Sequence, residues 1–328
     1  MEYKFSDDIS SFTESHQEWT KNKKHFYDFF LNNSIGRTFT CQWVNDQSLK
    51  NSDFQYIILG QQRNKSYDLS VVKVNLDPKT INDSQQNKFQ DVFSENQRSE
   101  INRARHQPGN PNIIAAIQES GSIILLKYNY FNQNSNNDSI SITVKHEHTC
   151  TGYGLAWNPY NNLQFISGAY DKTIILWDVD RIASKLSKLN KFNDHDGEVE
   201  QIALWDTRVL EKRIHSFIQH SDKVYRVCFS PTEKNVFASI SEGNNLIIWD
   251  YSKIGQEQIG READIGPPEM IFTHTGHTEM IRDFDWNPHI PWTFTSVDDD
   301  DQNQVWKVKE SVILDDEENN YFKQLEEL

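Results

Sequence analysis

The sequence predicts an all-β propeller, a ring of small sheets called blades, because one supersecondary unit is repeated along the chain. An aromatic-x-Pro turn precedes a closing Trp by 20 residues in three places: Trp157-Asn158-Pro159 with Trp177, Phe229-Ser230-Pro231 with Trp249, and Trp286-Asn287-Pro288 with Trp306. Each copy opens with an alternating strand, crosses the turn, continues through a small-residue strand and ends on an apolar strand. That order is typical of a four-stranded propeller blade.

Each unit also carries a His ahead of it, a Ser in its middle and the closing Trp. A buried indole needs a partner for its N–H group, and a hydroxyl shared with an imidazole can supply one. We therefore expect a structural hydrogen-bond network formed by His148, Ser167, Asp171, Trp177, His220, Ser239, Trp249, His277, Ser296 and Trp306.

The spacing of the closing residues is broken once. Trp249 follows Trp205 by 44 residues, which matches one blade, but Trp205 follows Trp177 by only 28; a blade needs about 40 to 45. We expect about five full blades and one stub, at 40–77, 100–130, 152–180, 223–251 and 280–308, with the stub near 198–218. Such a ring would be strained, open or unusually small, and an open ring leaves a sheet edge that invites pairing with another chain.

The two ends of the chain differ from the repeats. Glu18 to Leu31 carries Trp19 and several Phe and Tyr residues among polar ones, which predicts an amphipathic helix on the outside of the ring. The expected organisation is an N-terminal extension with this helix (1–36), the propeller (37–310), and an acidic C-terminal tail with a short helix (311–328).

Composition narrows the class of protein. The formal charge of −15 disfavours nucleic acid and membrane surfaces and favours basic protein partners. The three cysteines Cys41, Cys150 and Cys228 lack close spacing, so neither a disulfide framework nor a metal site is expected. With no apolar run of about 18 residues, we expect a soluble intracellular protein.

Catalysis is not expected, and neither is a cofactor. The chain shows no phosphate-cradling glycine loop, no nucleophile with a neighbouring base and no clustered metal ligands. The sequence therefore favours a binding protein over an enzyme.

Several longer motifs are more specific than the repeat. They are Asn102-Arg103-Ala104-Arg105, Gly152-Tyr153-Gly154-Leu155, Trp205-Asp206-Thr207-Arg208, Ser252-Lys253-Ile254-Gly255 and Gly266-Pro267-Pro268-Glu269. With them the chain resembles, from about 18 to 308, the histone-binding WD-repeat family of retinoblastoma-binding proteins and the small subunit of chromatin assembly factor 1. The resemblance implies a WD40 propeller whose family ring has seven blades, here shortened by most of two. The front of the fourth family blade would then be joined to the back of the fifth. This junction is either a feature of a divergent paralogue or an error in the gene model.

The resemblance also implies a function. Family members are nuclear, non-catalytic histone chaperones and scaffolds in chromatin assembly, remodelling, deacetylase and Polycomb complexes, and we expect a monomer within such hetero-complexes. The first helix of histone H4 would lie between the N-terminal helix and the Pro-Pro loop, in a pocket formed by Phe26, Phe29, Phe30, Glu262, Asp264 and Glu269. A histone H3 tail would bind the flat face, at Glu100, Asn102, Arg103, Tyr153, Tyr225 and Asp299.

The chain departs from the family pattern at both sites. Thr151 and Lys223 replace acids on the flat face, and Arg261 and Ile265 replace acids in the Pro-Pro loop. A different class of function also stays open, because Trp205-Asp206-Thr207-Arg208 fits the Trp-Asp-x-Arg motif of substrate receptors of cullin-type ubiquitin ligases. Binding to the ligase adaptor that is lost in Arg208→Ala would distinguish this alternative from histone binding.

Overall fold

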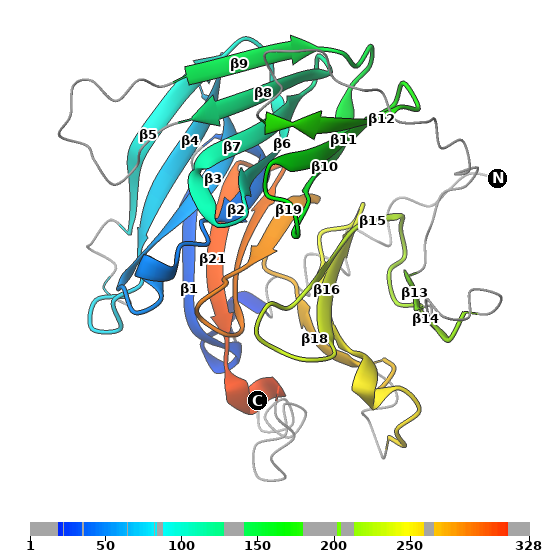
Figure 1. The fold of residues 1–328 in the computed structure, drawn as a ribbon. Coiled ribbons are helices and arrows are strands. Elements are labelled where there is room, and N and C mark those ends of the chain that lie inside the picture. The colour runs from blue at the N-terminus through cyan, green and yellow to red at the C-terminus, as the bar shows by residue number, and fades with distance from the viewer. Residues whose placement is uncertain are drawn as a thin grey trace, which may run out of the picture.

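The computed structural model describes residues 19–313 except 22, 35, 64, 82, 84–87, 128–140, 180–201, 205–212 and 259–265. These residues form a β-propeller of five blades and a two-stranded stub, and neighbouring strands within each sheet are antiparallel (Figure 1). The fold class expected from the repeats is confirmed.

The first three blades follow chain order, with the innermost strand first. Blade 1 contains β2 (Arg37–Trp43), β3 (Phe54–Arg63), β4 (Ser66–Asn75) and β5 (Phe89–Gln97). Blade 2 contains β6 (Ile101–Gln107), β7 (Asn110–Gln118), β8 (Ser122–Lys127) and β9 (Ser141–His146). Blade 3 has three described strands, β10 (Gly152–Trp157), β11 (Gln164–Ala169) and β12 (Ile174–Asp178).

The rest of the ring consists of the stub and two further blades. The stub pairs β13 (Ile202–Leu204) with β14 (His215–Phe217). Blade 4 contains β15 (Val224–Phe229), β16 (Val236–Ser241), β17 (Leu246–Asp250) and β18 (Met270–His274). Blade 5 contains β19 (Ile281–Trp286), β20 (Thr293–Asp298), β21 (Gln302–Val308) and β1 (Tyr27–Ser34). Short helical turns are η1 (Gln47–Leu49), η3 (Tyr251–Lys253) and α3 (Glu310–Ile313).

The N-terminal segment differs from its prediction. Residues 19–21 and 23–26 are helical, but from Tyr27 the chain is strand β1, which pairs with β21 in the register Phe30 to Trp306. The reason is that blade 5 needs a fourth strand, and ladder pairing with β21 overrides the helical spacing of the aromatic residues. The expected helix over Glu18 to Leu31 is therefore only about half helical, and Phe29 and Phe30 lie on a strand.

Blade-to-blade packing is continuous except in one place. Separate buried clusters join blade 1 to blade 2, blade 2 to blade 3, blade 4 to blade 5, and blade 5 to blade 1. The stub packs against blade 4, where Phe217 contacts Phe237 and Trp249 at ring-centroid distances of 4.9 and 5.3 Å. None of these described clusters joins blade 3 to the stub or to blade 4, so the core is interrupted there.

Candidate functional site

Every innermost strand breaks its register at the same repeat position. A β-bulge separates Thr38 from Thr40, Ile101 from Arg103, Gly152 from Gly154, Val224 from Arg226 and Ile281 from Asp283. A bulge leaves one residue outside the ladder and re-aims its side chain. The bulged residues Phe39, Asn102, Tyr153, Tyr225 and Arg282 thus occupy equivalent places around one end of the central channel, which we call the mouth.

Aromatic side chains form part of this mouth. Tyr153, Tyr170 and Tyr225 are 41%, 74% and 37% exposed, and the rings of Tyr153 and Tyr170 lie 5.8 Å apart. Burial raises the pKa of Tyr225 well above its usual range, with Asp283 adding to the effect. Burial also raises the pKa of Tyr153, so the Tyr153 and Tyr225 phenols stay neutral at physiological pH. All three tyrosines present π faces and hydroxyl groups to a ligand.

Carboxylates lie beside these rings. The backbone N–H of Glu119 donates to the carbonyl oxygen of Glu100 at 2.9 Å, so both residues stand at the end of the β6–β7 hairpin. Burial raises the pKa of Glu100, and Glu119 raises it further, against the opposing effects of Arg37 and Arg282. Within the described residues neither carboxylate has a salt bridge, so a cationic side chain placed between them would relieve their repulsion.

A third acid at the mouth, Asp299, is already paired. Asp299 accepts from Arg282 Nε at 2.7 Å and also contacts Arg282 Nη2, while Arg37 approaches it at 3.6 Å. Both guanidinium groups also lie over the ring of Phe39, at 4.8 Å for Arg37 and 5.8 Å for Arg282. Asp299 therefore belongs to the mouth, but its charge is largely neutralised within the chain.

Below the mouth an ion cluster fills the channel. Asp283 has no exposed side-chain surface; its Oδ1 accepts from Arg103 Nη1 at 2.6 Å and lies 3.0 Å from Arg226 Nη1 in a salt bridge. Its Oδ2 accepts from Arg105 Nη2 at 3.0 Å, from Thr40 Oγ1 at 2.8 Å and from the Cys41 N–H at 3.0 Å. A buried carboxylate with this many donors is a structural centre that ties blades 1, 2, 4 and 5 together.

The electrostatics of this cluster follow from its geometry. Burial alone would raise the pKa of Asp283, but the three guanidinium groups outweigh it and hold that pKa well below its usual range. Burial dominates at the neighbouring Asp285, whose pKa is raised to about 6. Burial likewise lowers the pKa of Arg103 to about 10, a value at which Arg103 is still charged at neutral pH.

Two residues expected to contact a ligand on the flat face are instead engaged by other groups of the chain. Asn102 is 1% exposed and donates to the Gly152 carbonyl oxygen at 3.0 Å, and Arg103 binds Asp283 and the Tyr153 carbonyl oxygen. The other four, Glu100, Tyr153, Tyr225 and Asp299, lie together at the mouth. The physical reason for the difference is that Asn102 and Arg103 satisfy buried backbone and carboxylate groups.

The structure adds Glu119, Tyr170, Arg37 and Arg282 to the mouth, all of which sequence reasoning missed. Two of them, Glu119 and Tyr170, could have been found from their position in the repeat. The N–H groups of Glu119, Tyr170, Glu242 and Asp299 each donate to the carbonyl of the residue before an innermost strand. Aligning the repeats at this backbone hydrogen bond would have placed Glu119 and Tyr170 at positions equivalent to Asp299.

The residues expected to be structural form a repeated network. In each of three blades one Ser hydroxyl joins a His to the closing Trp: His148 and Trp177 on Ser167, His220 and Trp249 on Ser239, and His277 and Trp306 on Ser296, all at 2.7 to 3.1 Å. Asp171 contacts His148 Nδ1 at 3.1 Å, whereas His277 uses Asp298 at 2.6 Å.

The residues expected in the histone H4 pocket do not form one surface. Phe26 is 7% exposed inside the core of blades 4 and 5, Phe29 packs toward blade 1, and Phe30 packs toward Trp19. The expected apolar stripe is absent because β1 sends alternate side chains to opposite faces.

Of the three acids expected in that pocket, Glu269 is the one that the structure describes. Glu269 is 3% exposed, and its Oε1 lies 2.6 Å from His215 Nε2 of the stub, so it presents no free carboxylate. Glu262 and Asp264, like Trp205 to Arg208 of the alternative motif and the tail beyond 313, lie outside the described residues.

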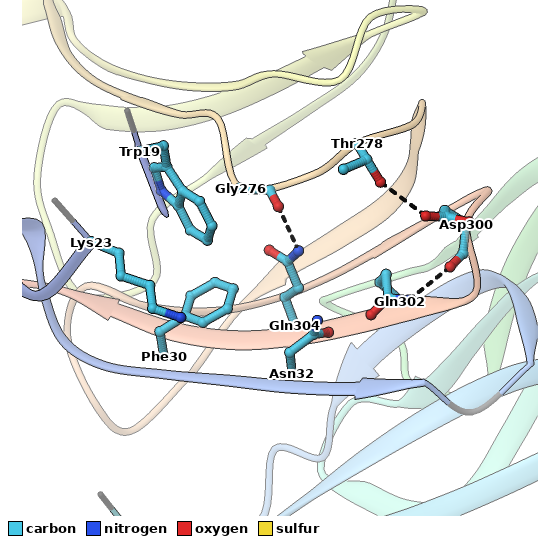
Figure 2. Close-up of a pocket in the computed structure, with 9 residues that line it drawn as sticks. All are labelled: Trp19, Lys23, Phe30, Asn32, Gly276, Thr278, Asp300, Gln302 and Gln304. Carbon is cyan, nitrogen blue, oxygen red and sulfur yellow. Dashed lines mark hydrogen bonds between the residues drawn. The ribbon is translucent and has the colours of Figure 1, made fainter. Parts of the chain in front are cut away.

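A small cleft lies beside the helical segment and is lined in part by Phe30, one of the residues expected in the histone H4 pocket. It has a volume of about 300 Å³ and is bounded by Trp19, Lys23 and Phe30 on one side and by Thr278, Asp300 and Gln302 on the other (Figure 2). Lys23 Nζ lies 5.3 Å from the Phe30 ring centre and 5.9 Å from that of Trp19. The chain's own lysine thus occupies the aromatic wall of the cleft.

The described part of the chain contains neither a cluster of metal ligands nor a membrane-spanning helix. There, no three His, Cys, Asp or Glu side chains gather in a way that could hold a metal ion. No helix of that part is long and apolar enough to span a membrane.

Comparison with protein families agrees with the repeat. Residues 141–178 and 211–250 match the family described as WD domain, G-beta repeat. The first match spans β9 to β12 and the second β14 to β17. Each match thus begins with the outermost strand of one sheet and ends with the third strand of the next.

Proposed function

We propose that this WD-repeat protein is a non-catalytic nuclear scaffold that binds basic histone segments, with the channel mouth as its principal site. WD repeats on a propeller support a scaffold or adaptor role that acts through protein–protein contacts. The observation that carries the proposal is the pair of unneutralised carboxylates, Glu100 and Glu119, beside three partly exposed tyrosines.

This arrangement fits a lysine or arginine side chain of an extended peptide. A cation between Glu100 and Glu119 would lower the electrostatic energy of both acids, and its alkyl stem would lie against Tyr153 and Tyr170. The net charge of −15 adds a long-range attraction for basic chains. Among such basic chains, the family resemblance favours the N-terminal tail of histone H3 as the ligand. The protein would bind this tail in a complex that also contains H3–H4.

Histone H4 is the second proposed ligand and has less support. The apolar residues expected to hold its first helix are buried or dispersed, and Glu269 is bonded to His215. The resemblance and the acids Glu262 and Asp264 carry this part of the proposal. The two histone sites therefore need separate tests.

Fluorescence anisotropy with a labelled N-terminal histone H3 peptide tests the mouth. In the double variant Glu100→Gln, Glu119→Gln we expect affinity to fall at least about tenfold, about 1.4 kcal/mol. Glu95→Gln on the outer strand β5 is the matched control and should leave affinity unchanged. Equal affinity in the double variant, with unchanged thermal unfolding, would remove the mouth from the proposal.

A histone H4 first-helix peptide tests the second site in the same assay. Glu262→Lys with Asp264→Lys should weaken it at least about tenfold and leave the H3 peptide unaffected. Unchanged H4 binding would exclude the Pro-Pro loop as the H4 site. Adaptor binding that is lost in Arg208→Ala, with no histone binding, would instead favour the ubiquitin-ligase alternative.

A further inference from the structure

The large apolar side chains exposed in the described residues are concentrated at the interruption of the ring. Apart from Phe54 and the three tyrosines of the mouth, they belong to blade 3, to blade 4 or to the segments next to β14: Tyr160, Leu163, Ile166, Ile214, Ile218, Val227 and Phe229. An exposed apolar patch of this kind marks an interaction surface more often than an accident of composition.

The repeat register identifies what the interruption lacks. The WD-repeat match begins at β9 in one copy and at β14 in the other, and both are outermost strands. Trp205 follows β13 as Trp177 closes β12 and Trp249 closes β17, so β13 holds the place of a third strand. The stub is therefore the outer half of a blade, and the described residues include no first or second strand for it.

Among the described residues, no strand pairs with the inner edge of β13. In the other described sheets the third strand pairs on one side with the second strand, whereas β13 pairs only with β14 among the described residues. The Leu204 carbonyl oxygen accepts from the Ile214 N–H at 2.8 Å and so points toward β14. Because successive residues direct their peptide groups to opposite edges, the N–H and C=O groups of Ala203 point to the open edge.

Apolar faces flank this edge on both sides. On blade 4, Phe229 is paired with Phe237, so it shares the face that the stub covers farther out, and Phe229 and Val227 remain 61% and 43% exposed. On blade 3, Phe165 packs toward blade 2, so its neighbour Ile166, 42% exposed, faces the interruption.

We propose that the interrupted blade binds an extended segment of a partner protein, which adds as a strand to the open edge of β13. One face of the segment would pack on Val227 and Phe229 and the other on Ile166. A strand covered on both faces is a continuous apolar run, and the acidic chain favours Lys or Arg at its ends. The expected partner motif is thus a short aliphatic run with basic flanks, bound independently of the mouth.

The test uses the chain's own second-strand sequence as the probe. Residues Ile113–Ile117 of β7, which fill the second-strand place in blade 2, are synthesised with two Lys at each end and a fluorescent label. Binding to the full chain is followed by anisotropy. Two altered peptides accompany it: one with Glu in place of the flanking Lys, and one N-methylated at alternate residues, which removes the ladder donors.

Two variants of the protein distinguish pairing at the open edge of β13 from packing on the apolar face of blade 4. Ala203→Pro removes the N–H at the open edge without removing a bond to β14, and Phe229→Ser removes the exposed ring. We expect each to weaken the peptide at least about tenfold, and the N-methylated peptide to lose binding to a similar extent. Phe54→Ser, an exposed Phe on β3 away from the interruption, should change affinity by less than about twofold. Thermal unfolding checks that every variant is folded.

The proposal is overturned if the Lys-flanked peptide does not bind, or if it binds equally after N-methylation. If the Glu-flanked peptide binds as tightly as the Lys-flanked peptide, the proposed preference for basic flanking residues is overturned. Analytical ultracentrifugation of the chain without peptide tests whether a second copy of the chain occupies the edge. A dimer that becomes a monomer in Ala203→Pro would show that a second copy, rather than a partner, occupies the edge.

Discussion

Glu119 and Glu100 are joined backbone to backbone, 2.9 Å from the N–H of the first to the carbonyl oxygen of the second, and their carboxylates share one side of the channel mouth. The contact repeats one found in blades 3, 4 and 5, but only in blade 2 does it bring two acids together. The open end of the β6–β7 pair, opposite its hairpin turn, therefore also creates the negative pole of the site.

A first prediction concerns the coupling of these two acids. Burial and Glu119 both raise the pKa of Glu100, so Glu119→Gln should lower it toward the ordinary glutamate value. Carbon-detected NMR titration of the Glu100 carboxyl group measures the change. Glu95→Gln serves as control and should leave the titration of Glu100 as it is. A Glu100 pKa that does not move in Glu119→Gln would show that burial acts alone.

A second prediction concerns His220, which contacts the Ser239 hydroxyl at 2.7 Å. Burial lowers its pKa to about 4, below the value near 6.5 of an unfolded imidazole. The unfolded chain thus binds the proton more tightly, so the stabilising contribution is full above about pH 6.5 and is lost as pH falls toward about 4.

The size of this effect can be measured against His220→Gln, which keeps a polar group near Ser239. The free energy of unfolding of the native chain should lose up to about 3 kcal/mol, relative to the variant, between about pH 6.5 and pH 4. Urea denaturation at several pH values gives both quantities. A difference between the two proteins that stays constant with pH would argue against a neutral, buried His220.

The repeat, the closing Trp residues and the shared Ser hydroxyls could be predicted from the sequence because each depends on residues a fixed distance apart. The network of Ser167 with His148 and Trp177 is such a case. The stub could also be located, since the missing residues shorten the spacing of Trp205 from Trp177.

What could not be predicted depends on contacts between distant segments. Tyr27 to Ser34 resembles a helix by spacing, but β21 needs a partner strand. Glu269 resembles a free loop acid, yet it is held by His215 of the stub. Arg103 resembles a surface ligand residue until Asp283, 180 residues later, is placed beside it.

A third prediction concerns Asp283. Its side chain is fully buried among Arg103, Arg105 and Arg226, which lower its pKa. Asp283→Asn keeps the size but leaves the buried Arg103 and Arg105 without their counter-ion and Arg226 with Asp285 at 3.7 Å, so the free energy of unfolding should fall by about 3–5 kcal/mol. Asp299→Asn at the partly exposed Arg282 pair is the control, with a loss below about 1 kcal/mol. Urea denaturation compares them, and similar losses in both variants would mean that the channel cluster contributes no more than a surface ion pair.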